Sequence, residues 1–335
     1  MKWIERACFF TIVLAMVGCA YFQPRPDETI SLQTIPTLPY EFIVINVQPG
    51  DSLSSLAKKH LRNPSLDWVI AEVNGIDALT PGQMLIIPLS PLERGGITLR
   101  GYQTVPILTY HKFSDTGKDI VTVTRRAFED QMRFLKNHGY RVISLDEFFD
   151  FLELRQSIPK KSVVITIDDG WRSTYDIAFP ILKKYGYPAT LFVYTDFIID
   201  NSKNLNWAIL REMMQGGFSI QSHSKTHRYL DRRIKRETFK QYFESIKEEL
   251  AESAMIIRQH LGTEVKYLAY PYGETNHLVI ALLEKLGYRG ALTVERESNP
   301  SFMNRYRVNR SMVYGSFDLE DFSNNLKIFN KQALQ

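Results

Sequence analysis

Short apolar strands alternate with helices between residues 105 and 335, and this alternation constrains the fold more than any other feature of the chain. Strands are expected at 105–110, 141–145, 162–167, 189–194, 218–221, 267–270 and 290–294. Their nearly continuous apolar character indicates burial on both faces, which is typical of parallel sheets. Helices are expected around Phe128, Met132 and Leu135 and at about 175–185, 207–215, 236–260 and 277–286. The pattern predicts an α/β fold, a distorted (β/α)7-type barrel.

Polar residues follow several of these strands at the point where each one ends. His111 follows the first strand, Asp168 and Asp169 the third, His223 the fifth and Tyr272 the sixth. The carboxyl ends of parallel barrel strands meet at one rim, where catalytic side chains lie. We therefore expect these residues to lie close together. Helical periodicity would not produce this coincidence.

The histidine pair and the aspartate pair among these polar residues supply the side-chain types that bind metal ions. His223 and His227 are four residues apart, a spacing that on a helical turn places both imidazoles on one face. With Asp168 and Asp169 they predict a two-histidine, one-carboxylate site in which one carboxylate binds the ion and the other accepts a proton. Such an ion acidifies a water and polarises a carbonyl. Each pair alone has a structural alternative, because acidic pairs cap helices and this histidine spacing also arises by chance.

Three motifs at these positions resemble a known family. TIDDG (166–170), SHSKTH (222–227) and AYPYG (269–273) resemble the first three motifs of polysaccharide deacetylases, carbohydrate esterase family 4 with its NodB-homology domain, and the similarity runs from about 105 to 315. The resemblance implies Asp168 as general base and a backbone N–H at Tyr272 that stabilises the oxyanion. It also implies a divalent metal, Zn²⁺ before Co²⁺, Ni²⁺, Fe²⁺ or Mn²⁺. The implied ligands are Asp169, His223 and His227.

The chain departs from the family pattern at two points. Ala269 stands where the family usually has an arginine that orients the base, so Arg172 or Arg310 is expected to supply that charge. The catalytic-acid histidine normally comes late, whereas here PILTYHKF places His111 on the first strand. This permuted order resembles poly-β-1,6-N-acetylglucosamine deacetylases and implies that His111 protonates the leaving amine. The alternative is a core histidine bonded to backbone.

Two tryptophans are candidates for substrate contact. Trp171 follows the acidic pair, and Trp207 resembles the apolar wall of the family's acetyl pocket. Sugar rings stack on such faces, although aromatic residues near strand ends more often belong to the core.

Residues 41–89 predict a small separate domain with the order strand, helix, helix, strand. INVQPGDSLSSLAKKH, EVNGI and LTPGQMLIIP resemble a LysM module, which binds chains containing N-acetylglucosamine (GlcNAc). The resemblance places the glycan groove between two loops, and Asp51 is also expected to cap the first helix. The loop residues are Gly50, Asp51, Ser52, Asn74, Gly75 and Ile76. Residues 90–104 are expected to be a linker before the deacetylase domain at 105–335.

The N-terminus predicts export. Residues 1–18 have a basic start and a short apolar core typical of a signal peptide. MVGC (16–19) resembles a bacterial lipobox, which implies lipidation of Cys19 and anchoring in the cell envelope, in the outer membrane or periplasm; plain secretion is the alternative. Residues 19–40 are expected to be a tether. The remaining chain has no cysteine, which excludes a disulfide framework, and an evenly spread net charge of +4 argues against nucleic acid as a partner.

Together these features predict a metal-dependent N-deacetylase of a GlcNAc-containing polysaccharide. The LysM resemblance favours peptidoglycan, whereas the position of His111 favours a β-1,6-linked exopolysaccharide. Two alternatives stay open: an O-acetyl esterase that uses the same site, and a non-catalytic lipoprotein that only binds the cell wall.

Overall fold

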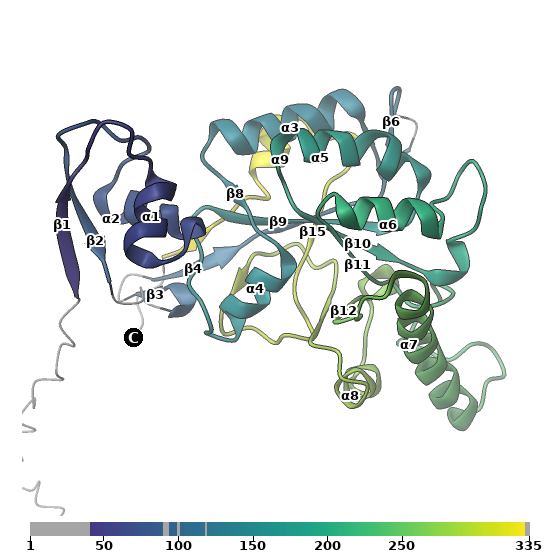
Figure 1. Cartoon of the computed structure of the whole chain (residues 1–335). Coiled ribbons are helices and arrows are strands. Elements are labelled where there is room, and N and C mark those ends of the chain that lie inside the picture. The colour runs from purple at the N-terminus through teal and green to yellow at the C-terminus, as the bar shows by residue number, and fades with distance from the viewer. Residues whose placement is uncertain (1–40, 90–93, 99–100, 118, 332–335) are drawn as a thin grey trace, which may run out of the picture. The chain divides into compact units, whose positions relative to one another are not determined.

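A computed structural model describes residues 41–89, 94–98, 101–117 and 119–331 (Figure 1). The expected signal peptide, the tether and Cys19 lie outside the described residues. The elements described below belong to one compact unit, Phe42–Gln335. Among the helices of the described ranges, none combines the length and apolar character needed to cross a bilayer.

The N-terminal region has the predicted βααβ order. Its elements are β1 (Phe42–Asn46), α1 (Leu53–Leu61), the short 3-10 helix η1 (Pro64–Leu66), α2 (Asp67–Asn74) and β2 (Met84–Pro88). β1 and β2 pair antiparallel and cover a small core that contains Leu56, Ile70 and Ile87. The helix cap differs from the expectation. Ser52, not Asp51, caps α1 in a reciprocal arrangement with Ser55, while Asp51 accepts a hydrogen bond from the Gln48 N–H.

A curled sheet of parallel strands forms the centre of the large region. Its order is β13-β12-β11-β10-β9-β5-β15, with β8 also paired to β9. Each of the seven predicted strands has a counterpart here, and β15 is an addition. The strands are β5 (Ile107–Tyr110), β8 (Arg141–Val142), β9 (Ser162–Asp169), β10 (Ala189–Val193), β11 (Phe218–Ser222), β12 (Tyr267–Ala269), β13 (Gly290–Leu292) and β15 (Ser311–Met312).

One stretch of chain contacts β13 at one edge of this sheet and β5 next to the other edge. Val308 bonds through its N–H to the Ala291 carbonyl of β13, and a few residues later Ser311 is paired with Leu108 of β5. Arg310 lies between these two contacts and is fully buried. The segment 305–312 therefore carries a cation into the interior of the curled sheet.

Most of the helices that cover the sheet match those that apolar periodicity predicts, whereas the helices at Leu145–Leu152 and Leu319–Ser323 were not predicted. Phe128, Met132 and Leu135 are all buried on one face of α3, whose N-terminus is capped by Thr124. In Figure 1, α3, α5 and α9 lie on one side of β9, and α4 and α8 lie on the other. The helices are α3 (Arg125–Asn137), α4 (Leu145–Leu152), α5 (Phe179–Tyr185), α6 (Trp207–Gln215), α7 (Phe239–Leu261), α8 (His277–Lys285) and α9 (Leu319–Ser323), with short turns η2 (Arg94–Gly96), η3 (Thr174–Ala178), η4 (Thr195–Phe197) and η5 (Pro271–Gly273).

Part of the expected linker is structured. Residues 101–104 belong to β4 (Gly101–Val105), which pairs with β3 (Ile97–Thr98), β14 (Asn299–Pro300) and β16 (Phe329–Asn330). Gln103 is buried and donates its side-chain amide to the Pro159 carbonyl. This strand was not predicted because its segment contains a glycine and several polar residues. The remaining short strands, β6 (Lys112–Ser114) and β7 (Thr122–Thr124), pair with one another.

Candidate metal and catalytic site

The ends of β9 and β11 bring three potential metal ligands together. Asp169 is the last residue of β9, and His223 directly follows β11. One ligand atom each from Asp169, His223 and His227 lies within 4.8 Å of the others, a cluster that could hold a metal ion. Strand order therefore assembles a group whose members are far apart in the chain.

The spacing of these atoms suits one small divalent cation. The two Nε2 atoms of His223 and His227 are 3.2 Å apart, and Asp169 Oδ1 lies 3.7 and 3.6 Å from them. The point equidistant from these three atoms is about 2 Å from each, which is the usual length of a Zn–N or Zn–O bond.

The protonation of the histidines also fits a cation. His223 Nδ1 lies 2.7 Å from the Ala269 carbonyl oxygen, so this nitrogen donates its hydrogen there and Nε2 keeps its lone pair for a metal. Burial, together with the neighbouring His223, lowers the pKa of His227 to about 4. The His227 imidazole is therefore neutral near pH 7, the form that binds metals.

The histidine loop is not helical, which corrects the expectation of a shared helical face. Ser224 and His227 have positive φ angles, 71° and 64°, and the Ser224 hydroxyl accepts the His227 N–H. Asp169 and Tyr272 also have positive φ, so this site holds four of the seven non-glycine residues of that kind in the described ranges. Such angles cost energy and concentrate at functional sites, where surrounding contacts impose them.

Glu249 of α7 holds this loop in place, a role that the sequence pattern did not predict. Its Oε2 accepts the backbone N–H groups of Lys225 and Thr226, each at 2.9 Å, and its Oε1 accepts the Thr226 hydroxyl at 2.6 Å. Glu249 is 6% exposed. A glutamate in a buried position of the predicted helix 236–260 was the available signal, since such a carboxylate needs partners.

Asp168 and Arg310 form a buried ion pair beside the metal cluster. The guanidinium donates to both oxygens of Asp168, at 2.7 and 2.8 Å, and to the Thr293 carbonyl. Burial raises the pKa of Asp168, but the charge and hydrogen bonds of Arg310, together with the charges of His223 and His111, outweigh it, and the pKa falls to about 2. Arg172, the other candidate, pairs instead with Asp176 at the surface.

His111 and Tyr272 lie at the same strand ends. Burial lowers the pKa of His111, although Asp168 and Asp169 partly offset this through their charges. Tyr272 is half-exposed, and its ring stacks on Tyr229 with centroids 3.9 Å apart. The same ring meets His227 edge-on.

The two tryptophans have different surroundings. Trp171 donates its indole N–H to Asp169 Oδ2 at 2.9 Å, so it contacts a candidate ligand directly. Trp207 stacks on His260 and packs against the core. The contacts described for Trp207 therefore do not join it to the metal cluster.

The predicted glycan-binding residues of the small domain have structural contacts. Asn74 donates to the Ile70 and Ile86 carbonyls and accepts the Ile86 N–H, so its side chain ties α2 to β2. Gly75 ends α2 in a left-handed conformation, and Ile76 packs against the small core. Gly50 also has a positive φ.

Comparison with known families identifies both regions. Residues 155–291 match the family model described as polysaccharide deacetylase, and residues 45–88 match that of the LysM domain. The chain therefore combines a polysaccharide deacetylase domain, of the carbohydrate esterase family 4 type, with a LysM domain.

Individual relatives agree with this assignment. A poly-β-1,6-N-acetyl-D-glucosamine N-deacetylase of Staphylococcus aureus is 28% identical over 60% of this chain and 71% of its own length. The deacetylase PplD of Streptococcus pyogenes shares the fold, with 24% identity and a TM-score of 0.61 over 68% of this chain and 99% of its own. IcaB from Ammonifex degensii is 25% identical, with a TM-score of 0.57 over 64% of this chain and 93% of its own.

Proposed function

We propose that this protein is a divalent-metal-dependent hydrolase that removes N-acetyl groups from GlcNAc residues of a bacterial cell-wall or extracellular polysaccharide. The observation that supports the proposal most is the Asp169, His223 and His227 cluster with the Asp168–Arg310 ion pair beside it. The S. aureus relative, named for such an activity on a β-1,6-linked polymer, supports the reaction class. Peptidoglycan and a β-1,6-linked polymer are both candidate substrates.

In this proposal Asp169, His223 and His227 hold the ion. A divalent ion in that position supplies a Lewis acid that acidifies a water molecule and polarises the acetamide carbonyl. Asp168 accepts the proton of the attacking water, and Arg310 keeps that carboxylate ionised and oriented. The Arg310 guanidinium occupies one lone pair on each Asp168 oxygen, so the other lone pair of each oxygen remains available for the proton.

Two further groups complete the proposed reaction. The backbone N–H of Tyr272 donates to the developing oxyanion, a contribution typically worth about 3 kcal/mol. His111 donates a proton to the departing amine, so that acetate and a free glucosamine unit leave. Trp171 keeps Asp169 oriented through its indole N–H.

The LysM domain is proposed to keep the enzyme on its polymer. Its loops at 50–52 and 74–76 would form the groove, with backbone groups as the main donors because the Asn74 amide is already used within the domain. Binding there raises the local concentration of acetylated sugars at the catalytic domain. A lipid on Cys19 would anchor the exported chain in the bacterial envelope.

The direct test is acetate release from peptidoglycan fragments, chito-oligomers and β-1,6-linked GlcNAc oligomers, with and without a chelator. We expect acetate and free amine from at least one polymer and loss of both after chelation. Asp168→Asn should retain metal and lose activity, whereas His227→Ala should lose bound metal. Acetate from O-acetylated chains only would identify an esterase, and acetate from no substrate would refute the proposal.

A further inference from the structure

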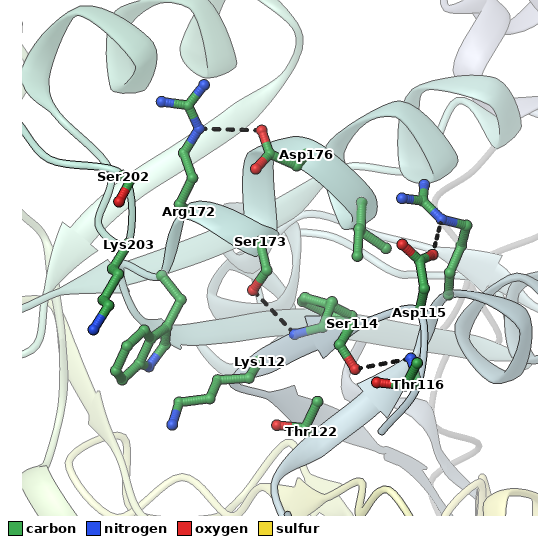
Figure 2. Close-up of a pocket in the computed structure, with 14 residues that line it drawn as sticks. Lys112, Ser114, Asp115, Thr116, Thr122, Arg172, Ser173, Asp176, Ser202 and Lys203 are labelled. Carbon is green, nitrogen blue, oxygen red and sulfur yellow. Dashed lines mark hydrogen bonds and ion pairs between the residues drawn. The ribbon is translucent and has the colours of Figure 1, made fainter. Parts of the chain in front are cut away.

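A pocket of about 620 Å³ has Lys112, Arg172 and Lys203 among its lining residues (Figure 2). Lys112 lines this pocket and is the residue after His111. Trp171 also lines it, and its indole N–H bonds to Asp169. One side chain, that of Trp171, therefore joins the pocket to the metal cluster. The volume of the pocket lies in the range of small-ligand sites.

The pocket is lined by more positively charged side chains than negatively charged ones. Arg125 pairs with Asp115 at 2.7 Å and Arg172 with Asp176 at 3.1 Å, which uses both lining carboxylates. Figure 2 shows these pairs as dashed lines. Two lining lysines, Lys112 and Lys203, then remain without a lining carboxylate.

In the described part of the chain, neither of these two ammonium groups has a carboxylate within hydrogen-bond distance. Lys112 reaches Asp119 at 3.8 Å, which is too long for a hydrogen bond. In the described part of the chain, no carboxylate lies within ion-pair distance of the exposed Lys203 ammonium.

Both lysines are connected to Trp171, the pocket residue that contacts the metal cluster. The Lys112 ammonium lies 4.0 Å from the centroid of the Trp171 ring, a cation–π contact. Lys203 lies on a segment that runs along Trp171: its carbonyl accepts the Arg172 N–H at 2.9 Å, and the next residue, Asn204, bridges Trp171. The Lys112 ammonium thus contacts the Trp171 ring itself, and the backbone that carries Lys203 is bonded beside it.

Resting on the proposed function, we propose that this pocket binds the carboxylate of a sugar adjacent to the GlcNAc that is deacetylated. Neutral GlcNAc polymers offer no anion for Lys112 and Lys203, and a free glucosamine amine would be repelled. A carboxylate accepts charge-assisted hydrogen bonds from both lysines while its ring packs on the pocket wall. The preferred substrate class is therefore a polymer in which GlcNAc alternates with an acid-bearing sugar.

The test compares matched oligomers that differ in charge. The first is a GlcNAc oligomer with lactyl-ether carboxylates on alternate sugars, and the second is the same oligomer with those carboxyls amidated. A third, GlcNAc alternating with uronic acid, separates the two sources of the carboxylate. We expect a lower KM and a higher kcat/KM for the lactyl acid, the uronic acid or both than for the amide. Lys203→Gln should reduce this preference about two- to fivefold, as for an exposed ion pair.

Two comparisons make the result decisive. Lys285→Gln removes the same charge from the exposed end of α8, which does not line the pocket, and should leave the preference unchanged. The amidated oligomer is the second comparison, because it presents the same chain to the same enzyme without the carboxylate. Equal kcat/KM for acid and amide, or an undiminished preference after Lys112→Gln with Lys203→Gln, would overturn the assignment.

Equilibrium binding of the same oligomers at low and high salt gives a second readout that does not need turnover. Tighter, salt-sensitive binding of an acid form supports the pocket, and equal affinity for acid and amide counts against it. Acetate release from none of the oligomers would refute the proposed function, while the binding result still decides the pocket.

Discussion

Replacement of Arg310 is the sharpest test of the buried charge pair. Arg310→Gln leaves Asp168, which is 1% exposed, without its countercharge. The pKa of this carboxyl is lowered from 3.8 to about 2 in the folded chain. This difference corresponds to roughly 2.5 kcal/mol of stability at pH 7. Loss of one partner from a buried pair typically costs about 3–5 kcal/mol, so we expect a loss in that range.

The pH dependence follows from the direction of the shift. A carboxyl whose pKa is depressed by folding contributes its full stabilisation above the unfolded value near 4, and loses it as the pH falls to about 2. The stability difference between wild type and Arg310→Gln should therefore shrink as the pH falls through this window. If Asp168 is the base, its raised pKa in the variant also moves the acid limb of kcat/KM to higher pH.

Urea unfolding followed by tryptophan fluorescence, at several pH values, measures the loss of stability. Acetate release over the same pH range measures the shift of the acid limb of kcat/KM. Arg310→Lys keeps the positive charge but not the bidentate hydrogen bonding, so its stability should lie between those of wild type and Arg310→Gln. Arg172→Gln is the matched control: its surface pair with Asp176 should contribute less than about 1 kcal/mol. A stable Arg310→Gln protein with an unshifted acid limb would refute the reasoning, as would a larger effect in Arg172→Gln.

Other substitutions test the supports of the site. Glu249→Gln should weaken metal affinity about 10- to 100-fold in a calorimetric titration, whereas Glu248→Gln, the exposed neighbour on α7, should not; equal affinities would contradict the role of Glu249. Gly273→Ala and Gly287→Ala both place alanine at φ near +80°, which costs about 1–2 kcal/mol. At Gly273 the new methyl also overlaps Val294, whereas Gly287 faces open space, so only the first should also abolish acetate release.

The fold was predictable where periodicity is strong. Alternating apolar segments indicated the parallel sheet, and polar residues at strand ends indicated its functional rim. Segments with weak patterns were misjudged. Leu145, included at the end of a strand, begins α4 because Ser144 and Glu147 form a capping box. The two-residue strand β15 is too short to leave a periodic signal, although it pairs with β5.

The candidate ligands were predictable from motif spacing, but their backbone was not. The left-handed angles of Ser224 and His227 arise from tertiary contacts, including those of Glu249, which a local pattern does not encode. The choice between Arg172 and Arg310 also stayed open in the sequence. It depends on which distant segment enters the sheet, and local composition carries no such information.

The position of Arg310 between β13 and β5 has a consequence for the order of folding. Arg310 and Asp168 are 142 residues apart in the chain, and contacts of such separation form late because loop closure costs entropy. Until segment 305–312 docks, the carboxylate lacks its cation and the hydrolytic centre is incomplete. In the proposed mechanism, a chain whose C-terminal part has not yet closed the sheet would therefore be inactive.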